Sequence, residues 1–391
     1  MFTDRISCSA VVTVAVPAET ATAERRVALV PEVIGRLTAA GAAVVVQAGA
    51  GRNANYADAE YADAGARVVP DASAVFGAAD VVVKVAPPSP AEAGQFATGS
   101  AYLGFLPPNA DDVLQALAAR KLTAFSLERL PRISRAQSMD ALSSQALVSG
   151  YQATLLAAER LPRFFPMFMT AAGTVPPAKV LVLGAGVAGL QAIATARRLG
   201  AVVEGYDVRS AAAEEVRSLG ATFVELELET QEGAGGYAKE QSEDFLRRQR
   251  ELIGKHVAAS DVVITTAAIP GRAAPVLVTA EMVERMRAGS IVVDLAAESG
   301  GNVEPSRPGE DVQVGGATVI GAKNMPSSMP VHASNLYARN ITNLLLLLIK
   351  DGNLAPDWDD EIVRGCCLLR DGVPLEDPAQ TLVMGAGGAP Q

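Results

Sequence analysis

The stretch VLVLGAGVAGLQAIATARRLGAVVEGYDVR, residues 180–209, decides the fold of this chain. Its first residues, Val180 to Leu183, form an unbroken apolar run, which is typical of a parallel strand covered on both faces. A G-x-G-x-x-G turn follows, and after it we expect a helix over Leu190–Leu199 and a second strand over Ala201–Tyr206. The stretch therefore predicts one strand–turn–helix–strand unit.

The glycines and the acid of this unit indicate a dinucleotide site. Gly184 makes the tight turn, Gly186 lets the backbone reach a pyrophosphate, and Gly189 allows close packing of helix on strand. Phosphates would lie on free N–H groups at the positive end of the helix. Asp207 follows the second strand, where it can accept hydrogen bonds from both adenosine ribose hydroxyls. The alternative is a glycine-rich turn in an ordinary α/β domain, and the agreement of strand, helix, second strand and acid disfavours it.

The same acid bears on the choice of nucleotide. Asp207 would repel a 2′-phosphate, so NAD(H) is preferred over NADP(H). Arg209 lies two residues later, and an arginine can accommodate a 2′-phosphate, so its effect on this choice is left open.

Composition limits the class of protein. With 391 residues the chain is too long for one ordinary core, and 49% hydrophobic against 19% charged residues suits an α/β protein. The net charge of −10 argues against nucleic acid and against an anionic membrane surface. The longest apolar run, Leu344–Ile349, is far shorter than the roughly 20 residues of a membrane-spanning helix. We therefore expect no nucleic-acid partner and no membrane span.

Two residue types add to this picture. Three cysteines, of which Cys366 and Cys367 are adjacent, make no disulfide framework and favour a reducing cytoplasm. The two histidines, His256 and His332, leave no metal-ligand cluster, and a lone histidine such as His332 is more often structural than catalytic.

The rest of the chain predicts a second domain of the same class. Short strands and helices alternate from Val11 to Ser126, which indicates a parallel sheet with helices on both faces. A long helix over Ser143–Arg160 and a linker over Thr170–Pro177 lead into the nucleotide domain, and a helix over Ser334–Lys350 returns to the first domain. We expect two doubly wound, parallel-sheet (Rossmann-like) α/β domains with a cleft between them. The first is discontinuous, residues 1–143 plus 330–391, and the NAD(H)-binding domain covers residues 144–329.

A polar loop, RISRAQSMDALS, precedes the long helix. Its side chains Arg132, Gln137, Asp140 and Ser143 could orient a nicotinamide carboxamide and its ribose. Alternatively, the loop is a polar linker in which Asp140 caps the next helix. The residues alone leave both interpretations open.

Three further loops are candidates for contact with a ligand. A glycine-rich insertion around Tyr237 could be a lid over the cofactor or a plain disordered insert. The loop from Thr265 to Pro275 begins at a strand end, where backbone meets the nicotinamide side of the cofactor, or it is an ordinary proline-rich loop. Asp294, at an equivalent strand end, could position a substrate or cap a turn.

Together these pieces resemble the soluble NAD(H)-binding α subunit (domain I) of proton-translocating nicotinamide nucleotide transhydrogenase, a relative of alanine dehydrogenase. The resemblance covers nearly the whole chain, in VPAET, RRVALVPE, VVVKVAPP, TTAAIPGRAAPVLV, VVDLAAESGGN and LYARNITNLL besides the stretch quoted first. The loops RISRAQSMD and GGYAKE discriminate best, because a generic Rossmann protein has neither.

The resemblance implies roles for the matching residues. The dihydronicotinamide would be held by Arg132, Gln137, Asp140 and Ser143, which form the implied catalytic set. The implied cofactor-binding set is Gly184, Gly186, Val187, Ala188, Gly189, Asp207, Val208, Arg209, Gly236, Tyr237, Thr265, Thr266 and Ala267, with no metal. Tyr237 would lie on a mobile loop that closes over NAD(H).

The resemblance also implies an activity and partners. Hydride would pass directly from NADH to NADP⁺ on a separate NADP(H)-binding β subunit, coupled to proton translocation by a membrane-embedded transhydrogenase subunit. The chain would be a homodimer in the cytoplasm, peripheral on the inner membrane through its partners. The shortage of histidine is consistent with this activity, because direct hydride transfer needs no acid or base on this chain.

Two alternatives are weighed against this interpretation. Alanine dehydrogenase would use a substrate-binding arginine, lysine and histidine, and Arg26 and Lys84 stand where the first two are expected. The stretch Tyr102–Asn109 contains no histidine, so the group that would manage the substrate's proton is missing. An NAD-sensing regulatory subunit is also possible, but the retained nicotinamide-end loop disfavours it.

Overall fold

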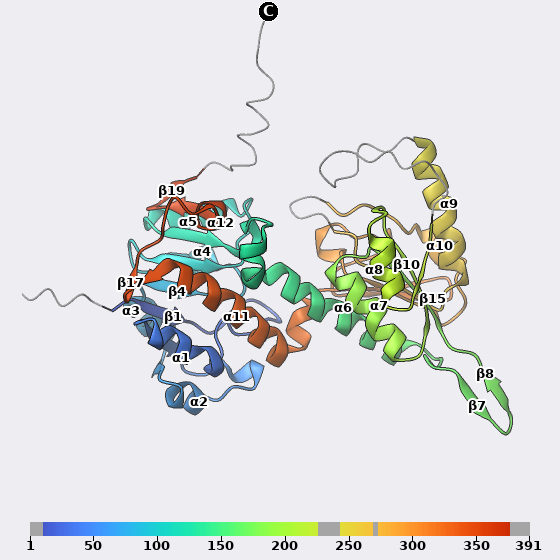
Figure 1. Ribbon diagram of the computed structural model, residues 1–391, viewed down its shortest axis with the longest axis horizontal. Helices are drawn as coiled ribbons and strands as arrows, with labels where there is room; N and C mark the ends of the chain where they lie inside the picture. Colours follow the sequence, from blue (N-terminus) through green and yellow to red (C-terminus); the bar gives the residue numbers. More distant parts are fainter. Residues whose placement is uncertain (1–10, 226–242, 269–272, 376–391) are drawn as a thin grey trace, which may run out of the picture. The chain divides into compact units, whose positions relative to one another are not determined.

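A computed structural model describes residues 11–225, 243–268 and 273–375 of the chain (Figure 1). Contacts divide it into two compact units, which we call unit 1 (residues 1–145 and 329–391) and unit 2 (residues 146–328). Each unit is built around a mostly parallel sheet, which confirms the predicted α/β class. Helix α6 (Ala141–Arg160) begins in unit 1 and ends in unit 2.

Unit 1 holds an eight-stranded sheet in the order β19-β18-β6-β5-β4-β1-β2-β3. Its strands are β1 (Thr13–Val16), β2 (Ala43–Gln47), β3 (Arg67–Val69), β4 (Val81–Val83), β5 (Ala101–Gly104), β6 (Thr123–Ser126), β18 (Cys367–Arg370) and β19 (Val373–Pro374). Strands β1 to β6 run parallel, whereas β18 joins β6 and β19 joins β18 in the antiparallel sense. Val14 and Val16 belong to the apolar core on one face and Ala15 to the core on the other, so β1 is buried on both faces.

Helices cover both faces of this sheet, as alternating strands and helices require. They are α1 (Pro31–Ala39), α2 (Asp58–Asp63), α3 (Ala72–Ala78), α4 (Pro90–Ala93), α5 (Asp111–Ala119), α11 (Pro330–Leu348) and α12 (Glu361–Cys366). The returning helix α11 buries Tyr337, Ile341 and Leu344 in the same core as α1. It begins at Pro330, a residue favoured in the first helical turn, and therefore earlier than the sequence predicted.

Unit 2 holds a seven-stranded sheet in the order β11-β10-β9-β12-β13-β15-β14. Its strands are β9 (Lys179–Leu183), β10 (Val202–Tyr206), β11 (Thr222–Phe223), β12 (Val262–Thr265), β13 (Ile291–Asp294), β14 (Asp311–Val314) and β15 (Ala317–Gly321). Its helices include α7 (Val187–Arg198), α8 (Ala212–Ser218), α9 (Glu243–Ala259) and α10 (Ala280–Glu284). The strand order reverses beside β9, which pairs with β10 on one side and β12 on the other. Ligands of such sheets bind beyond the strand ends at this switch point.

The linker predicted over residues 170–177 is wrong. The structure has an antiparallel hairpin there, β7 (Phe168–Thr170) and β8 (Gly173–Val175), which projects from unit 2 (Figure 1). Gly173 has φ +131°, a conformation that favours glycine, and it supports the reversal of the chain. Every side chain of both strands is exposed.

Three further observations concern function classes. Cys366 and Cys367 are free and buried. Among the described residues, no group of three or more histidine, cysteine or acidic side chains is placed to hold a metal ion. In that same part of the chain, no helix combines the length and apolar character needed to cross a bilayer.

Candidate functional site

The glycine turn after β9 has the geometry that a dinucleotide needs. Gly184 has φ +97°, and a Cβ there would lie 2.6 Å from the Thr266 hydroxyl oxygen. At Gly189 a Cβ would lie 1.8 Å from the Gly184 carbonyl oxygen, so α7 approaches the turn too closely for any side chain. A Cβ at Gly186 would have no atom within 4 Å. The first and third glycines therefore serve packing, whereas the second leaves the approach to the backbone open.

Helix α7 points its N-terminus into this turn. Gly186 is its N-cap, and the first helical hydrogen bond runs from the Leu190 N–H to the Gly186 carbonyl at 2.8 Å. The N–H groups of Val187 and Ala188 precede that bond and have no acceptor within the helix. Val187 is 42% exposed. Free N–H groups at the positive end of a helix suit a pyrophosphate, so these residues fit the group that the sequence predicts.

Asp207 follows β10 and is tied to the turn. Its Oδ2 accepts the Ala185 N–H at 2.7 Å, and its Oδ1 accepts the Arg209 N–H at 2.9 Å. The Arg209 guanidinium donates as well, from Nε to Oδ1 at 3.0 Å and from Nη2 to Oδ2 at 3.1 Å. Burial by itself would raise the pKa of the Asp207 carboxyl, but the hydrogen bonds from Arg209 and Ala185 outweigh it and lower the pKa. Asp207 is therefore a carboxylate at neutral pH.

Residues after β12 lie against the same turn. The Thr266 hydroxyl donates to the Gly184 carbonyl at 3.0 Å. Ala267 is held by Asn302, whose Oδ1 accepts the Ala267 N–H at 2.9 Å and whose Nδ2 donates to the Ala267 carbonyl at 2.8 Å. Thr265 is fully buried, and its hydroxyl donates to Asp294 at 2.8 Å. Thr266 and Ala267 thus reach the glycine turn, whereas the Thr265 side chain lies inside the fold.

Asp294 and Asn302 support this loop from within. Asp294 is fully buried and accepts hydrogen bonds from the Ala296 N–H at 3.0 Å and the Asn302 N–H at 3.0 Å. It therefore caps the turn after β13, which is the second of the two roles considered for it. Asn302 lies eight residues along the chain and is also fully buried. Nothing in the sequence pattern singled out Asn302, because its partners come from separate loops.

The polar loop predicted at the nicotinamide end belongs to unit 1. Its short 3₁₀ helix η3 (Ser134–Met139) is fastened on two sides, since Arg135 forms an ion pair with Asp360 at 2.6 Å and Asn340 donates to the Ser138 carbonyl at 3.0 Å. Arg132 and Gln137 are exposed on this fastened loop, and their side chains have no hydrogen-bond partner in the part of the chain that the structure describes.

Asp140 and Ser143 end the same loop. Asp140 accepts the Ser143 N–H at 2.9 Å and the Ser143 hydroxyl at 2.6 Å. Asp140 thus caps α6, as one interpretation of the sequence expected. The role of these two residues at a nicotinamide stays a prediction.

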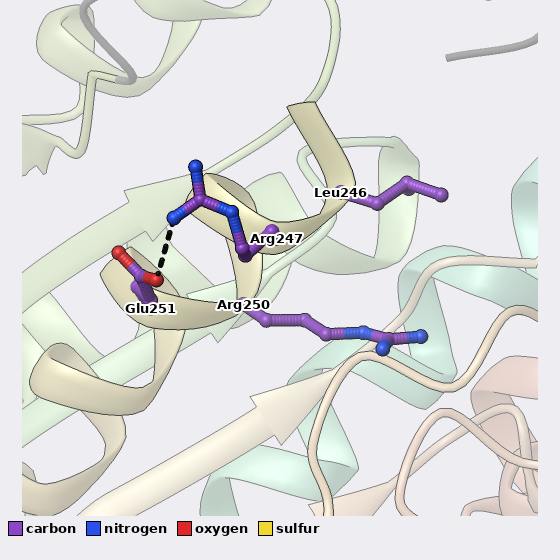
Figure 2. Close-up of a pocket in the computed structure, with 4 residues that line it drawn as sticks. All are labelled: Leu246, Arg247, Arg250 and Glu251. Atoms are coloured by element: carbon purple, nitrogen blue, oxygen red, sulfur yellow. Dashed lines mark hydrogen bonds and ion pairs between the residues drawn. The ribbon is translucent and has the colours of Figure 1, made fainter. Parts of the chain in front are cut away.

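The N-terminal part of helix α9 lies near the carboxyl end of β10 in unit 2. Gln249 is buried and donates to the Tyr206 hydroxyl at 2.8 Å, next to Asp207. A surface hollow of about 410 Å³ is lined here by Leu246, Arg247, Arg250 and Glu251. Figure 2 shows Arg247 paired with Glu251, while Arg250 and Leu246 extend away from that pair. The hollow is an open surface and shows none of the backbone donors of the glycine turn, so the turn remains the candidate site.

Two of the predicted cofactor-binding residues, Gly236 and Tyr237 on the expected lid, lie outside the described residues. Val208 is described, is 46% exposed, and lies between Asp207 and Arg209.

The two cations of the alternative activity are buried in unit 1. Arg26 forms an ion pair with Glu24 at 2.7 Å and donates to the Gln145 side-chain oxygen at 2.9 Å. Lys84 lies 3.2 Å from Glu19 and 3.1 Å from Glu92, and its side chain is 1% exposed. Both cations are therefore paired with carboxylates of the chain itself.

Known proteins match over nearly the whole chain. The model of the alanine dehydrogenase/PNT N-terminal domain matches residues 15–149, and that of the C-terminal domain matches residues 153–377. An NAD(P) transhydrogenase subunit alpha protein of Rhodospirillum rubrum is 47% identical over 381 residues, which is 94% of this chain and 98% of that protein. The crystal structure of transhydrogenase from Sinorhizobium meliloti has a TM-score of 0.82 at 43% identity and covers 94% of this chain and 99% of its own. Alanine dehydrogenase of Mycobacterium tuberculosis is 32% identical over 325 residues, 81% of this chain and 82% of that protein.

Proposed function

This chain belongs to the alanine dehydrogenase/PNT family, and from that membership we propose that it is the NAD(H)-binding subunit of a proton-translocating transhydrogenase. NAD(H) is its nucleotide, and the hydride passes directly to NADP⁺ held on a separate β subunit. A membrane-embedded subunit couples that step to proton translocation.

One observation favours the proposal over alanine dehydrogenase: Arg26 and Lys84 each form ion pairs with carboxylates of this chain. An amino-acid dehydrogenase needs a free cation for the substrate carboxylate and a group that manages the substrate's proton. Here the buried Arg26 has Glu24 as its ion-pair partner, and the buried Lys84 has Glu19 and Glu92. Recruiting either cation would leave a buried carboxylate without its partner, which is costly.

The role of the protein in the transfer is orientation. The reduced nicotinamide supplies the hydride, so the chain has to bind, orient and exclude water. In unit 2 the glycine turn and the N–H groups of Val187 and Ala188 hold the pyrophosphate, and Asp207 receives the adenosine ribose. In unit 1 the exposed Arg132 and Gln137 orient the nicotinamide from a loop that α11 and α12 fasten.

A homodimer is part of the proposal, and the hairpin β7–β8 is the surface that supports it. Exposed apolar side chains gather on the hairpin and in the segment just before it, with Met169 at 78%, Phe164 at 57% and Met167 at 56% exposure. The chain from Phe164 to Ala178 carries no charged residue, although the net charge of the whole is −10. A second copy therefore meets no like-charge repulsion at this hairpin, and an isolated two-stranded hairpin gains stability from a partner.

The complex of this chain with its partner subunits is, in this proposal, peripheral on the cytoplasmic side of the inner membrane.

A reconstitution experiment tests the function. The purified chain and NADH are mixed with the NADP(H)-binding domain of a transhydrogenase, and hydride exchange is followed. L-Alanine with NAD⁺, without any partner, is run in parallel. Exchange that needs both proteins, with no alanine oxidation, supports the proposal, whereas partner-free alanine oxidation would overturn it in favour of alanine dehydrogenase.

A further inference from the structure

The carboxylate of Asp207 has all of its acceptor positions in use. Oδ1 accepts from the backbone N–H and from Nε of Arg209, and Oδ2 accepts from the Ala185 N–H and from Nη2 of Arg209. A carboxylate offers about four lone-pair positions. A ribose hydroxyl can therefore be accepted only if one of these four donors leaves.

The four donors differ in how freely they can leave. The two backbone N–H groups are held by the glycine turn and by the chain after β10. The two side-chain donors belong to Arg209, whose side chain is 52% exposed against 8% for Asp207. Nη2 of Arg209 has one more acceptor, the Ala185 carbonyl at 3.3 Å. The displaceable donors are thus two N–H groups on one exposed side chain, and the ribose diol likewise offers two donors.

We propose that the adenosine ribose of NADH displaces the Arg209 side chain from the Asp207 carboxylate. Arg209 thereby reduces the selectivity of the site for NADH over NADPH. This inference rests on the proposed NAD(H) site and deepens it. Binding of NADH breaks the Arg209–Asp207 ion pair, which lowers NADH affinity. A 2′-phosphate meets a guanidinium at the same position, and that guanidinium offsets the repulsion from Asp207.

The opposite effects on the two nucleotides separate this role from a structural one. Without the Arg209 side chain, two lone-pair positions of Asp207 are free for the ribose and its charge is uncompensated. NADH affinity should then rise by about two- to fivefold, on the scale of an exposed ion pair. NADPH affinity should fall by about tenfold, because a charge-assisted hydrogen bond to phosphate is lost.

The test compares Arg209→Ala with a matched control. Arg285→Ala removes another exposed arginine of unit 2. Arg285 is the C-cap of α10 and forms an ion pair with Glu281 on that helix. Dissociation constants for NADH and for NADPH are measured by equilibrium titration of nucleotide fluorescence, and thermal melting checks the fold. Arg209→Lys, which keeps the charge without the planar fork, replaces the alanine variant if that one does not fold.

The expected result is tighter NADH and weaker NADPH binding in Arg209→Ala, with both constants unchanged in Arg285→Ala. If Arg209→Ala binds NADH no more tightly, or keeps the parent ratio of the two constants, the inference is wrong while the proposed function stands. If the parent chain binds neither nucleotide, the proposed NAD(H) site itself fails.

Discussion

Replacement of Gln137 by alanine separates orientation of the nicotinamide from binding of the dinucleotide. Gln137 lies exposed on η3 and its side chain has no hydrogen-bond partner among the described residues, so its loss removes no contact from the fold. We therefore expect the free energy of unfolding to change by less than about 0.5 kcal/mol. Dinucleotide affinity should also change little, because the glycine turn and Asp207 are in unit 2.

The expected effect is on the rate of hydride transfer. Loss of one neutral hydrogen bond in the transition state costs about 1 kcal/mol, which slows the transfer roughly fivefold. Misplacement of a reacting group by about 1 Å can cost about 100-fold. We expect a decrease between these limits, about 10- to 50-fold in the single-turnover rate, with the NADH dissociation constant within about twofold of the parent.

The assay mixes NADH-loaded chain rapidly with the NADP⁺-loaded domain of a transhydrogenase and follows one turnover. Ser134→Ala, an exposed substitution on the same η3 turn, is the matched control and should transfer hydride at the parent rate. Asp140→Ala provides a second comparison, because loss of the α6 cap costs about 1 kcal/mol of stability as well as orientation. An unchanged rate in Gln137→Ala, or a decrease that saturating NADH restores, would refute the assignment of Gln137.

Three further predictions follow from the buried contacts. Gly189→Ala would place a Cβ 1.8 Å from the Gly184 carbonyl oxygen, so we expect about 3 kcal/mol of destabilisation in thermal melting and loss of NADH binding; parental stability would contradict this. Asn302→Ala removes the amide that holds both polar atoms of the Ala267 backbone, and chemical denaturation should report about 2 kcal/mol lost together with weaker NADH binding, whereas an unaffected loop would keep both values. Burial raises the pKa of Glu128 from 4.5 to about 7. The folded state thus holds this proton more tightly than the unfolded state, and stability is lost as the pH rises from about 4.5 to 7. Glu128→Gln should remove that loss and be about 1 kcal/mol more stable than the parent at about pH 8, with no difference at about pH 4; identical pH profiles would contradict the assignment.

The buried parallel strands were the most predictable part of the fold. The strand expected at Val180–Leu183 is β9, which begins one residue earlier at Lys179, and the strand expected over Ala201–Tyr206 is β10, which begins one residue later at Val202. The central strands of parallel sheets are covered on both faces, so their sequences are continuous apolar runs that end at polar or glycine residues. The pattern is therefore local and can be read directly.

Strands β14 and β18 and the hairpin β7–β8 were not predictable in the same way. Among the described residues, β14 pairs with β15 alone, and β18 joins the sheet of unit 1 through β6, from which it lies far away in sequence. Strand β14 alternates polar and apolar residues and lacks the continuous apolar run of a central strand, whereas β18 has such a run in Cys367–Leu369 but nothing in it encodes the distant pairing with β6. The hairpin β7–β8 is entirely exposed, so burial imposes no alternation on its sequence, and its flanking prolines are typical of a linker.

The sequence by itself determined the parts of the site that depend on neighbouring residues. Gly184, Gly186 and Gly189 set the turn because backbone conformation and the absence of a Cβ are properties of single residues and short spacings. The position of Asp207 after β10 follows from the same local unit.

Only the tertiary structure decided how the charges and polar groups are paired. Arg209 could have faced solvent or a phosphate, and it lies on Asp207 because the glycine turn brings the Ala185 backbone to the same carboxylate. Arg26 meets Gln145 across 119 residues of sequence, and Thr265 meets Asp294 across 29. Burial makes an unpaired polar group costly, so the buried Arg26, Gln145, Thr265 and Asp294 take the partners that folding places beside them, and no pattern along the chain encodes that choice.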